Sequence, residues 1–480
     1  MNRANPAWHC RRVIVALGVG RSNSVSPSER ARWPGFLRDD DEPLRRIRCP
    51  LYGFIHFSPN EQRVVDHPVF QRLRFIRQLA LTEFVYPAAN HTRFEHSLGV
   101  MEVASQAFDR LSAKHGSLME HNFRGFAGFP DRHLDRARQV LRLAALLHDV
   151  GHCAFSHAAE PIVHARFNGK HDEFTVHLLE NHEFGQFVDS VFWDGCAKLV
   201  ASVVSGHPKV PPQLTVLHNL VSGEMDADRT DYLRRDAYHC GVDYGVFDYR
   251  RLLESLELEE DQQGGLAIAL HRDGLHCFEA LIIARYQMST QVYYHRLRRI
   301  YDYYLEKYCG TFSPEEFASD DRVLEMTDIK LLAEIRSDAR GAEGDRTRYA
   351  SRIWNRDHHR WVHATGANAN RKDALRSQEL LEVLRSKYLD VEFVLDKPRK
   401  ALTIYKLWTP DDTDDEGRLP MLNLVRSNGS KVVITEESQI LGKIPKTFQV
   451  IRIFAVLPRG ERLNEVRRFA RDQWLGLGGR

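Results

Sequence analysis

The feature that most constrains the fold is the helical periodicity of the apolar residues between Arg45 and about Tyr308. In residues 94–111, apolar side chains recur at intervals of three and four, which is typical of a helix with one buried face. Residues 140–147 are almost entirely apolar, and this predicts a helix buried on most sides. A third long helix is expected from about Glu279 to Tyr308.

The character of the chain changes after Gly310. A short helix is expected around residues 328–336, and β-branched residues dominate from Tyr388 onward. Strands are expected at residues 391–395, 402–407, 431–435 and 448–456, because turn-forming sequences separate these runs. The acidic segment 411–416 is expected to be a solvated loop. The fold class predicted is therefore mainly α, a helical bundle followed by a smaller C-terminal α+β region.

These patterns divide the chain into residues 1–43, 44–310 and 311–480. Residues 1–43 are rich in arginine, contain Ser-Pro and show no helical or strand period. We interpret them as a disordered extension or as a start codon placed too far upstream. The helical core is expected in residues 44–310 and the α+β region in residues 311–480.

Composition narrows the class of protein. The 480 residues carry 67 Lys and Arg against 65 Asp and Glu, a formal charge of +2, which does not favour dedicated binding of duplex nucleic acid. The balanced charge does not exclude a local basic groove that binds single-stranded nucleic acid. No run reaches the 18 or so apolar residues of a membrane span. The seven cysteines form no Cys-x-x-Cys pair, so free thiols in a reducing compartment are expected. We predict a cytoplasmic protein without a membrane partner.

Histidines and aspartates interrupt the apolar helices in three places: residues 91–96, residues 146–157 and residues 225–232. Burying a carboxylate and an imidazole is costly unless they are paired or bind a metal. Two imidazole nitrogens and two carboxylate oxygens would suit Fe, Mn, Zn or Mg, which the sequence does not distinguish. A single such motif is more often a hydrogen-bonded core residue. Three of them in one chain favour a metal site.

The motifs resemble the HD-domain phosphohydrolases, and most of all the deoxynucleoside triphosphate triphosphohydrolases, the branch of the dGTPases and the SAM-and-HD-domain dNTPase. The resemblance is close over about residues 45–336. It is carried by five segments: Asp-His-Pro-Val-Phe-Gln-Arg-Leu-Arg at 66–74, His-Thr-Arg-Phe-Glu-His-Ser-Leu-Gly at 91–99, His-Asp-Val-Gly-His at 148–152, Asp-Ala-Asp at 226–228 and Val-Tyr-Tyr-His at 292–295. The resemblance implies an HD-domain helical bundle as the catalytic core.

The resemblance also implies a ligand set and a group of catalytic side chains. One divalent metal ion would be bound by His96, His148, Asp149 and Asp228, and an additional Mg²⁺ could accompany the triphosphate. Asp226 is left out because, two residues from Asp228, it would point away on a helix. Residues near the α-phosphate would be His152 and His157, with Glu160 orienting His157. The general acid would be His171.

The substrate contacts implied by the resemblance fall into two groups. Contacts to the phosphates would come from Arg93, Arg229 and Arg285. Contacts to the sugar and base would come from Gln78, Leu79, Tyr232, Asp236 and Tyr293. Tyr232 would pack where a 2′-hydroxyl collides, and Asp236 would bind the 3′-hydroxyl. Arg285 and Tyr293 are expected two turns apart on one helix face. The chain departs from the family at Arg229, often Lys, and at Ala80, usually Gly.

The reaction implied is hydrolysis of a dNTP to deoxynucleoside and inorganic triphosphate, with a role in dNTP-pool control or phage defence. An HD-type nuclease or cyclic-nucleotide phosphodiesterase is the alternative, with His152, His157 and His171 serving a second metal. A non-catalytic dNTP-sensing module is a third possibility. The resemblance further implies a homo-oligomer, dimer or tetramer, and an activating nucleotide as an allosteric partner.

Overall fold

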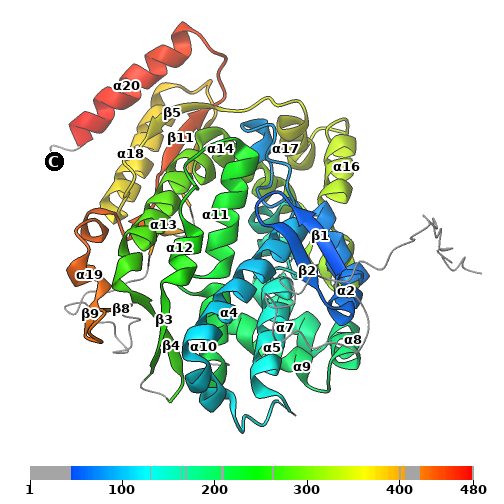
Figure 1. Cartoon of the computed structure of the whole chain (residues 1–480). Coiled ribbons are helices and arrows are strands. Elements are labelled where there is room, and N and C mark those ends of the chain that lie inside the picture. The colour runs from blue at the N-terminus through cyan, green and yellow to red at the C-terminus, as the bar shows by residue number, and fades with distance from the viewer. Residues whose placement is uncertain are drawn as a thin grey trace, which may run out of the picture.

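The computed structural model describes residues 45–129, 131–163, 165–167, 170–206, 210–261, 264–398, 402–405 and 422–477. The extension 1–43 and the acidic segment 411–416 lie outside these residues. The prediction of a mainly α fold is confirmed (Figure 1). Within the described chain, none of the helices combines the length and apolarity needed to cross a bilayer.

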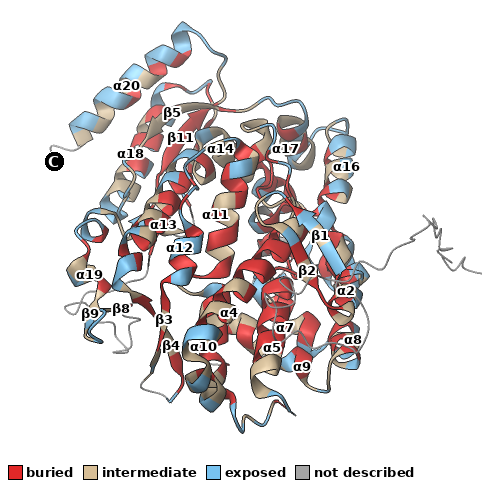
Figure 2. Ribbon diagram, viewed as in Figure 1, coloured by how far each residue is buried: buried red, intermediate tan, exposed pale blue. Residues whose placement is uncertain are grey.

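Three long helices form the centre of the molecule: α4 (Arg93–Phe123), α5 (His133–Leu147) and α11 (Ala227–Cys240). Helix α4 packs against both of the others, and its inner face is buried along most of its length (Figure 2). A capping box fixes its start, because the Thr92 backbone N–H donates to Glu95 Oε1 at 3.1 Å. The helices predicted at 94–111 and 140–147 lie within α4 and α5.

The remaining helices surround this centre or extend it toward the C-terminus. Between α5 and α11 lie α6 (Glu160–Val163), α7 (His171–Glu180), α8 (Glu183–Val191), α9 (Cys196–Ser205) and α10 (Thr215–Ser222). The others are α2 (Pro59–Val65), α3 (Pro68–Gln71), α12 (Tyr249–Glu254), α13 (Leu275–Met288), α14 (Arg296–Cys309), α15 (Asp320–Glu325), α16 (Asp328–Asp338), α17 (Asp345–Trp354), α18 (Arg371–Lys387), α19 (Ile434–Glu437) and α20 (Glu461–Leu477).

Four small sheets complete the fold of the described residues. An antiparallel hairpin joins β1 (Arg45–Cys49) to β2 (Gly53–Phe57), and a short pair joins β7 (Leu402–Thr403) to β10 (Thr447–Phe448). A three-stranded antiparallel sheet has the order β5 (Arg360–Ala364), β11 (Arg452–Ala455), β6 (Phe393–Asp396). A four-stranded sheet has the order β3 (Leu256–Glu260), β4 (Leu266–His271), β8 (Asn423–Val425), β9 (Lys431–Val433).

The four-stranded sheet ties the C-terminal region to the helical part of the chain. Strand β8 runs parallel to β4, with Leu270 opposite Leu424 and His271 opposite Val425. Buried Leu424 and Phe454 belong to the same apolar core as α4 and α5. A second, smaller core lies among α18, α20 and the three-stranded sheet.

Two predictions about secondary structure were wrong. The single helix expected at 279–308 is broken: α13 ends at Met288, a π-turn covers Ser289–Tyr293, and α14 begins after His295. Side chains cause the break, since Ser289 Oγ donates to the Arg285 carbonyl at 2.6 Å and His295 Nδ1 accepts from the N–H of Leu297. Strands β1 to β4 also interrupt the part of the chain expected to be wholly helical.

Candidate metal centre and active site

Four polar side chains meet at the centre of the bundle: one from α4, one from α11 and two from the turn that follows α5. Asp228 Oδ1 lies 3.1 Å from Nε2 of His96 and 3.7 Å from Nε2 of His148. The three ligand atoms are all within 4.8 Å of one another. Asp149 faces the same space, because its two oxygens lie 3.6 Å from His96 Nε2 and 3.4 Å from His148 Nε2. The structure thus gathers the four residues expected as metal ligands.

The histidines present the nitrogens that a metal would need. Nδ1 of His96 is bonded to Asp231 Oδ2 at 2.8 Å, and Nδ1 of His148 is bonded to the Ala145 carbonyl at 2.8 Å. Both Nε2 atoms are buried and have no hydrogen-bond partner among the described residues. Imidazoles fixed through one nitrogen, with the other directed at a carboxylate-lined space, are typical of metal ligands. This donor set fits a divalent cation.

The position of His148 and Asp149 corrects the expectation that they lie inside an apolar helix. Helix α5 ends at Leu147, and His148 is its C-cap residue. The turn after the helix packs closely against the start of α7 because residue 151 is glycine: a Cβ there would meet the His171 carbonyl at 2.4 Å. Because the helix has ended, the side chains of His148 and Asp149 can both face the metal centre. Adjacent residues within a helix point about 100° apart and would share one site less easily.

Asp231 is a functional candidate that sequence reasoning did not single out. Its carboxylate bonds His96 Nδ1 and also pairs with both Nε and Nη2 of buried Arg235, at 2.8 and 2.9 Å. Gly99 makes room for this group, since a Cβ at that position would lie 2.0 Å from Asp231 Oδ1. The available signal was the spacing on α11, where Asp231 follows Asp228 by three residues and precedes Arg235 by four.

The carboxylates make this centre attractive to positive charge. Burial opposes the protonation of His96, but Asp228 and Asp231 outweigh burial and raise the pKa of its imidazole to about 10. Burial also opposes the ionisation of Asp228, yet the two histidines hold its pKa below the usual range. A proton and a divalent cation compete for the same ring nitrogen. The site therefore favours a cation over an empty, neutral state.

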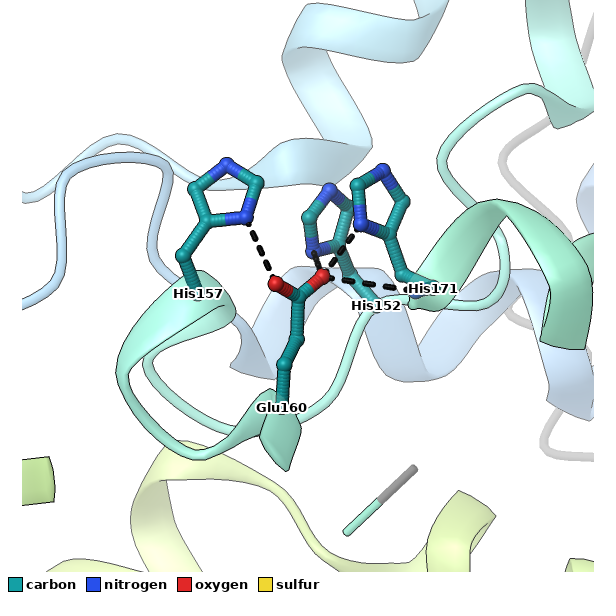
Figure 3. A group of neighbouring side chains, drawn as sticks. All are labelled: His152, His157, Glu160 and His171. Atoms are coloured by element: carbon teal, nitrogen blue, oxygen red, sulfur yellow. Dashed lines mark hydrogen bonds and ion pairs between the residues drawn. The ribbon is translucent and has the colours of Figure 1, made fainter. Parts of the chain in front are cut away.

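A second group of side chains lies beside the first: His152, His157, Glu160 and His171. Figure 3 shows the three imidazoles turned toward the Glu160 carboxylate. Glu160 accepts from Nδ1 of His171 in a short contact, bonds Nδ1 of His157 at 2.9 Å and lies 4.0 Å from Nδ1 of His152. Glu160 was expected to orient His157, and the structure shows that it holds His171 as well.

Two stacked histidines in this group differ in charge, because one is protonated and the other is neutral. The rings of His152 and His171 are parallel, with centroids 3.5 Å apart. Burial disfavours charge on both, but Asp172 and Glu160 raise the pKa of His171 to about 10. In His152, burial is reinforced by Arg93 and His171, and its pKa falls well below the usual value. At neutral pH the pair therefore consists of one imidazolium and one neutral imidazole.

Asp149 joins the two groups. Its Oδ1 lies 3.4 Å from His148 Nε2 and 3.3 Å from His152 Nε2, so one carboxylate borders both clusters. Its Oδ2 makes a short ion pair with Arg93, whose Nε also donates to Ser156 Oγ at 2.9 Å. Arg93 was expected to contact phosphates. The structure shows its guanidinium engaged with Asp149 and Ser156.

The residues expected to bind the sugar and base also lie together. Asp236 accepts from the Tyr293 hydroxyl at 2.7 Å and pairs with His91 Nε2 at 2.7 Å. The rings of Tyr232 and Tyr293 meet edge to face, with centroids 6.2 Å apart. Sequence reasoning assigned no role to His91, although it begins the first histidine motif. Its ring stacks on His239 at 4.4 Å and fixes the carboxylate of Asp236.

The Gln78–Leu79 segment is fixed by its backbone. The Gln78 N–H donates to the His91 carbonyl at 3.0 Å, while the amide oxygen of Gln78 is buried without a hydrogen-bond partner in the described chain. Leu79 is buried. Ala80 adopts a φ of +49°, so the position where the family usually has glycine keeps a left-handed backbone with an alanine.

The two remaining arginines differ in their surroundings. Arg229 lies 3.4 Å from Asp226 and 3.6 Å from Glu224, so acidic groups neutralise it. Arg285 is buried on α13, and its Nε and Nη1 have no hydrogen-bond partner among the described residues. We expected Arg285 and Tyr293 to share one helix face. They do not, because Tyr293 lies in the π-helical segment that follows α13. Asp226 is the N-cap of α11, which keeps its carboxylate on the Arg229 N–H at 2.6 Å.

Comparison with known proteins places this geometry in context. Residues 93–236 match the HD domain family, and residues 247–384 match the HD associated region. An uncharacterized Bacillus subtilis protein, YwfO, is 34% identical over 266 residues, which cover 54% of each chain. The deoxynucleoside triphosphate triphosphohydrolase SAMHD1 homolog of Dictyostelium discoideum is 27% identical over 292 residues, 59% of this chain and 50% of that protein. The chain spans about half the length of the curated relatives it matches.

Two solved structures share the fold over most of the chain. A hypothetical protein from Aquifex aeolicus superposes with a TM-score of 0.68 at 26% identity, covering 90% of this chain and 100% of that one. A phosphohydrolase from Bacteroides thetaiotaomicron superposes with a TM-score of 0.63 at 22% identity, covering 86% of this chain and 99% of its own. The arrangement of helices and small sheets is therefore shared beyond the HD domain itself.

Proposed function

Since the chain belongs to the HD-domain phosphohydrolase superfamily, we propose that it hydrolyses deoxynucleoside triphosphates to deoxynucleoside and inorganic triphosphate. The observation that supports this most is the position of Asp149 between two clusters. On one side, His96 and His148 direct their Nε2 atoms at the carboxylates of Asp149 and Asp228, and on the other lies the charged His171–Glu160 pair. The relatives named as dNTP triphosphohydrolases favour this substrate over other phosphate esters.

A divalent cation bound by His96, His148, Asp149 and Asp228 would supply Lewis-acid polarisation and charge neutralisation at the α-phosphate. The chain's own residues would complete the reaction. Water adds to the α-phosphorus and loses a proton to solvent, and the bond to the 5′-oxygen breaks. His171 gives its proton to the departing 5′-oxygen, and the Glu160 carboxylate holds the imidazolium in place. His152, neutral and stacked on His171, places no second charge there.

Phosphate and sugar recognition follow from the groups around this centre. Arg285 offers buried N–H donors that no protein acceptor uses in the described chain, and such donors suit phosphate oxygens. His157, whose side chain is exposed and bonded to Glu160, would be a further contact to the phosphates. Tyr232 would pack on the deoxyribose, and Asp236, fixed by His91 and Tyr293, would accept from the 3′-hydroxyl.

The test is the identity of the product. Purified protein is incubated with each of four dNTPs and with Mn²⁺, Fe²⁺, Zn²⁺ or Mg²⁺, and the products are separated by anion-exchange chromatography. We expect deoxynucleoside and triphosphate in equal amounts, and Asp149→Ala should abolish both products and metal binding while the fold survives. Triphosphate release by that variant at an undiminished rate would contradict the assignment.

A phosphodiesterase or nuclease is the second candidate, and one observation favours it. His152, His157, Glu160 and His171 each offer a donor atom within 4.8 Å of the others, and such a group could hold a second ion. The same chromatography with single-stranded DNA and cyclic dinucleotides decides between the two. One metal per chain with triphosphate release supports the first proposal, and two metals with diester cleavage supports the second.

A further inference from the structure

Asp328 is a buried carboxylate, 3% exposed, at the start of helix α16 and outside the candidate metal centre. It accepts hydrogen bonds from two backbone amides that are far away in the sequence. Oδ1 accepts from the N–H of Phe155 at 2.8 Å, and Oδ2 accepts from the N–H of Arg77 at 3.0 Å. One side chain therefore fastens the loop before His157 to the segment before Gln78.

The loop that Asp328 holds has a strained backbone. Phe155 and Ser156 have φ values of +51° and +55°, in the left-handed region that residues other than glycine rarely adopt. Such a backbone conformation persists only where its surroundings fix it. The Phe155 N–H is the group that Asp328 binds, so the carboxylate acts at the point of strain.

A chain of contacts runs from this loop to the metal centre. Ser156 Oγ accepts from Arg93 Nε at 2.9 Å, and Arg93 makes a short ion pair with Asp149. Ser156 Oγ also donates to the Arg77 carbonyl at 3.3 Å, so both segments that Asp328 binds meet at this hydroxyl. A shift of the loop would move Arg93 and, through it, the carboxylate of Asp149.

A second anchor fixes the beginning of the same loop. Arg72 Nη2 donates to the carbonyls of Val150 and His152, at 2.8 and 2.7 Å. Arg72 thus holds the residues around His152, and Asp328 holds those around Ser156. The catalytic histidines at 152 and 157 lie between or beside these two anchors, which come from outside the segment 148–157.

We propose that Asp328 is a positioning residue, which sets the loop at Phe155–His157 and the Arg77–Gln78 segment so that Arg93 keeps Asp149 directed at the metal centre. The inference rests on the proposed function for its kinetic consequence only. A carboxylate is required because it accepts two amides on two oxygens. An asparagine would offer one acceptor and direct its own N–H groups at the second amide.

The experiment compares Asp328→Asn with Asp320→Asn in the full chain. Asp320 is the first residue of α15, as Asp328 is of α16, but it bonds His177 and Arg166 instead of the loop. Hydrogen–deuterium exchange of peptides covering 150–157 and 76–79 measures the protection of the two backbone N–H groups that donate to Asp328. Metal content, melting temperature, kcat and KM for the preferred dNTP are measured on the same preparations.

For Asp328→Asn we expect exchange in both segments to accelerate at least about tenfold, and kcat to fall roughly tenfold to a hundredfold with a smaller change in KM. Metal content should fall relative to that of Asp320→Asn, because Asp149 is one of the proposed metal ligands and Arg93 would then hold it less well. A double variant with Ser156→Ala should lose no more activity than the worse single variant, since both changes act through Arg93.

Unchanged exchange in the two segments would overturn the proposal, and so would wild-type kcat or faster exchange throughout the molecule. Additive losses in the double variant would overturn the path through Ser156. If the wild-type protein released no triphosphate from any dNTP, the proposed function would fail. The exchange measurement would then still decide whether Asp328 positions the loop.

Discussion

His96 Nδ1 lies 2.8 Å from Asp231 Oδ2, and this bond turns Nε2 of the same ring toward His148 and Asp228. The carboxylate that holds the imidazole is itself held by Arg235. A candidate metal ligand is therefore fixed by a charged pair that has no exposed surface.

Replacing Asp231 by Asn should weaken metal binding roughly tenfold to a hundredfold, because a neutral amide supports the imidazole less well than a carboxylate. Titration calorimetry with Mn²⁺ measures the Kd, and circular dichroism shows that the fold is retained. Asp243→Asn, on the exposed loop after α11, is the matched control. Equal Kd values for the two variants would remove Asp231 from any role at the metal centre.

The pKa of His171 predicts the alkaline limit of activity. Glu160 and Asp172 outweigh burial and raise this pKa to about 10, so the imidazolium is available as an acid up to about that pH. Because the folded pKa lies above the unfolded value of 6.5, the charged pair also stabilises the fold fully below about pH 6.5 and loses that contribution as pH rises through about 10.

Glu160→Gln should therefore move the alkaline limb of the kcat profile to lower pH, since the neutral amide no longer retains the proton. Glu173→Gln, a half-buried residue of α7 whose carboxylate pairs with Lys170 and not with His171, should leave the limb where it is. The profiles are measured as triphosphate release between pH 6 and 10.5. An alkaline limb at the same pH in both variants would exclude the His171–Glu160 pair as the source of the proton.

Tyr232 should set the preference for deoxyribose. In Tyr232→Ala the space for a 2′-hydroxyl opens, so the ratio of dNTP to rNTP turnover, measured as kcat/KM, should fall about tenfold or more. Tyr238→Ala removes an exposed tyrosine from the same helix and should keep the ratio. A preserved ratio in both variants would assign sugar selection to other residues.

Ala80 should be a site where glycine stabilises the protein. Its φ of +49° costs about 1 kcal/mol or more for a residue with a Cβ, and glycine removes that cost. Ala80→Gly should raise the free energy of unfolding by up to about 1 kcal/mol, whereas Ala144→Gly, in the interior of α5, should lower it by a similar amount. Urea denaturation of both variants gives the comparison, and destabilisation at residue 80 would contradict it.

Sequence periodicity predicted the parts of the fold in which one pattern persists over several turns. The apolar spacing of residues 94–111 and the apolar run 140–147 correspond to α4 and α5. Strand β3 was missed although Leu256 and Leu258 alternate with Glu257 and Glu259, because five residues carry a weak signal beside long helices. The break after Met288 depends on side-chain bonds to the backbone, which periodicity does not report.

The candidate ligands could be found from motifs, whereas their supports could not. His96, His148, Asp149 and Asp228 stand in recognisable sequence patterns. Asp328 stands outside the motifs, and Asp231 lies within residues 225–232 without a pattern that reveals its role. Their partners lie 173 and 135 residues away along the chain. Tertiary packing alone brings such groups together. The activating nucleotide and the oligomer stay predictions from resemblance, and binding of single-stranded nucleic acid stays a possibility that the charge balance leaves open.

The parallel pairing of β8 with β4 has a practical consequence for anyone who shortens this protein. A fragment that ends near Gly310 would lack β8, so one edge of β4 would be unpaired and the buried leucines next to it would be exposed. An exposed strand edge of this kind favours intermolecular association. The C-terminal region therefore stabilises the helical region that carries the candidate metal centre, and expression of that helical region alone should yield aggregates.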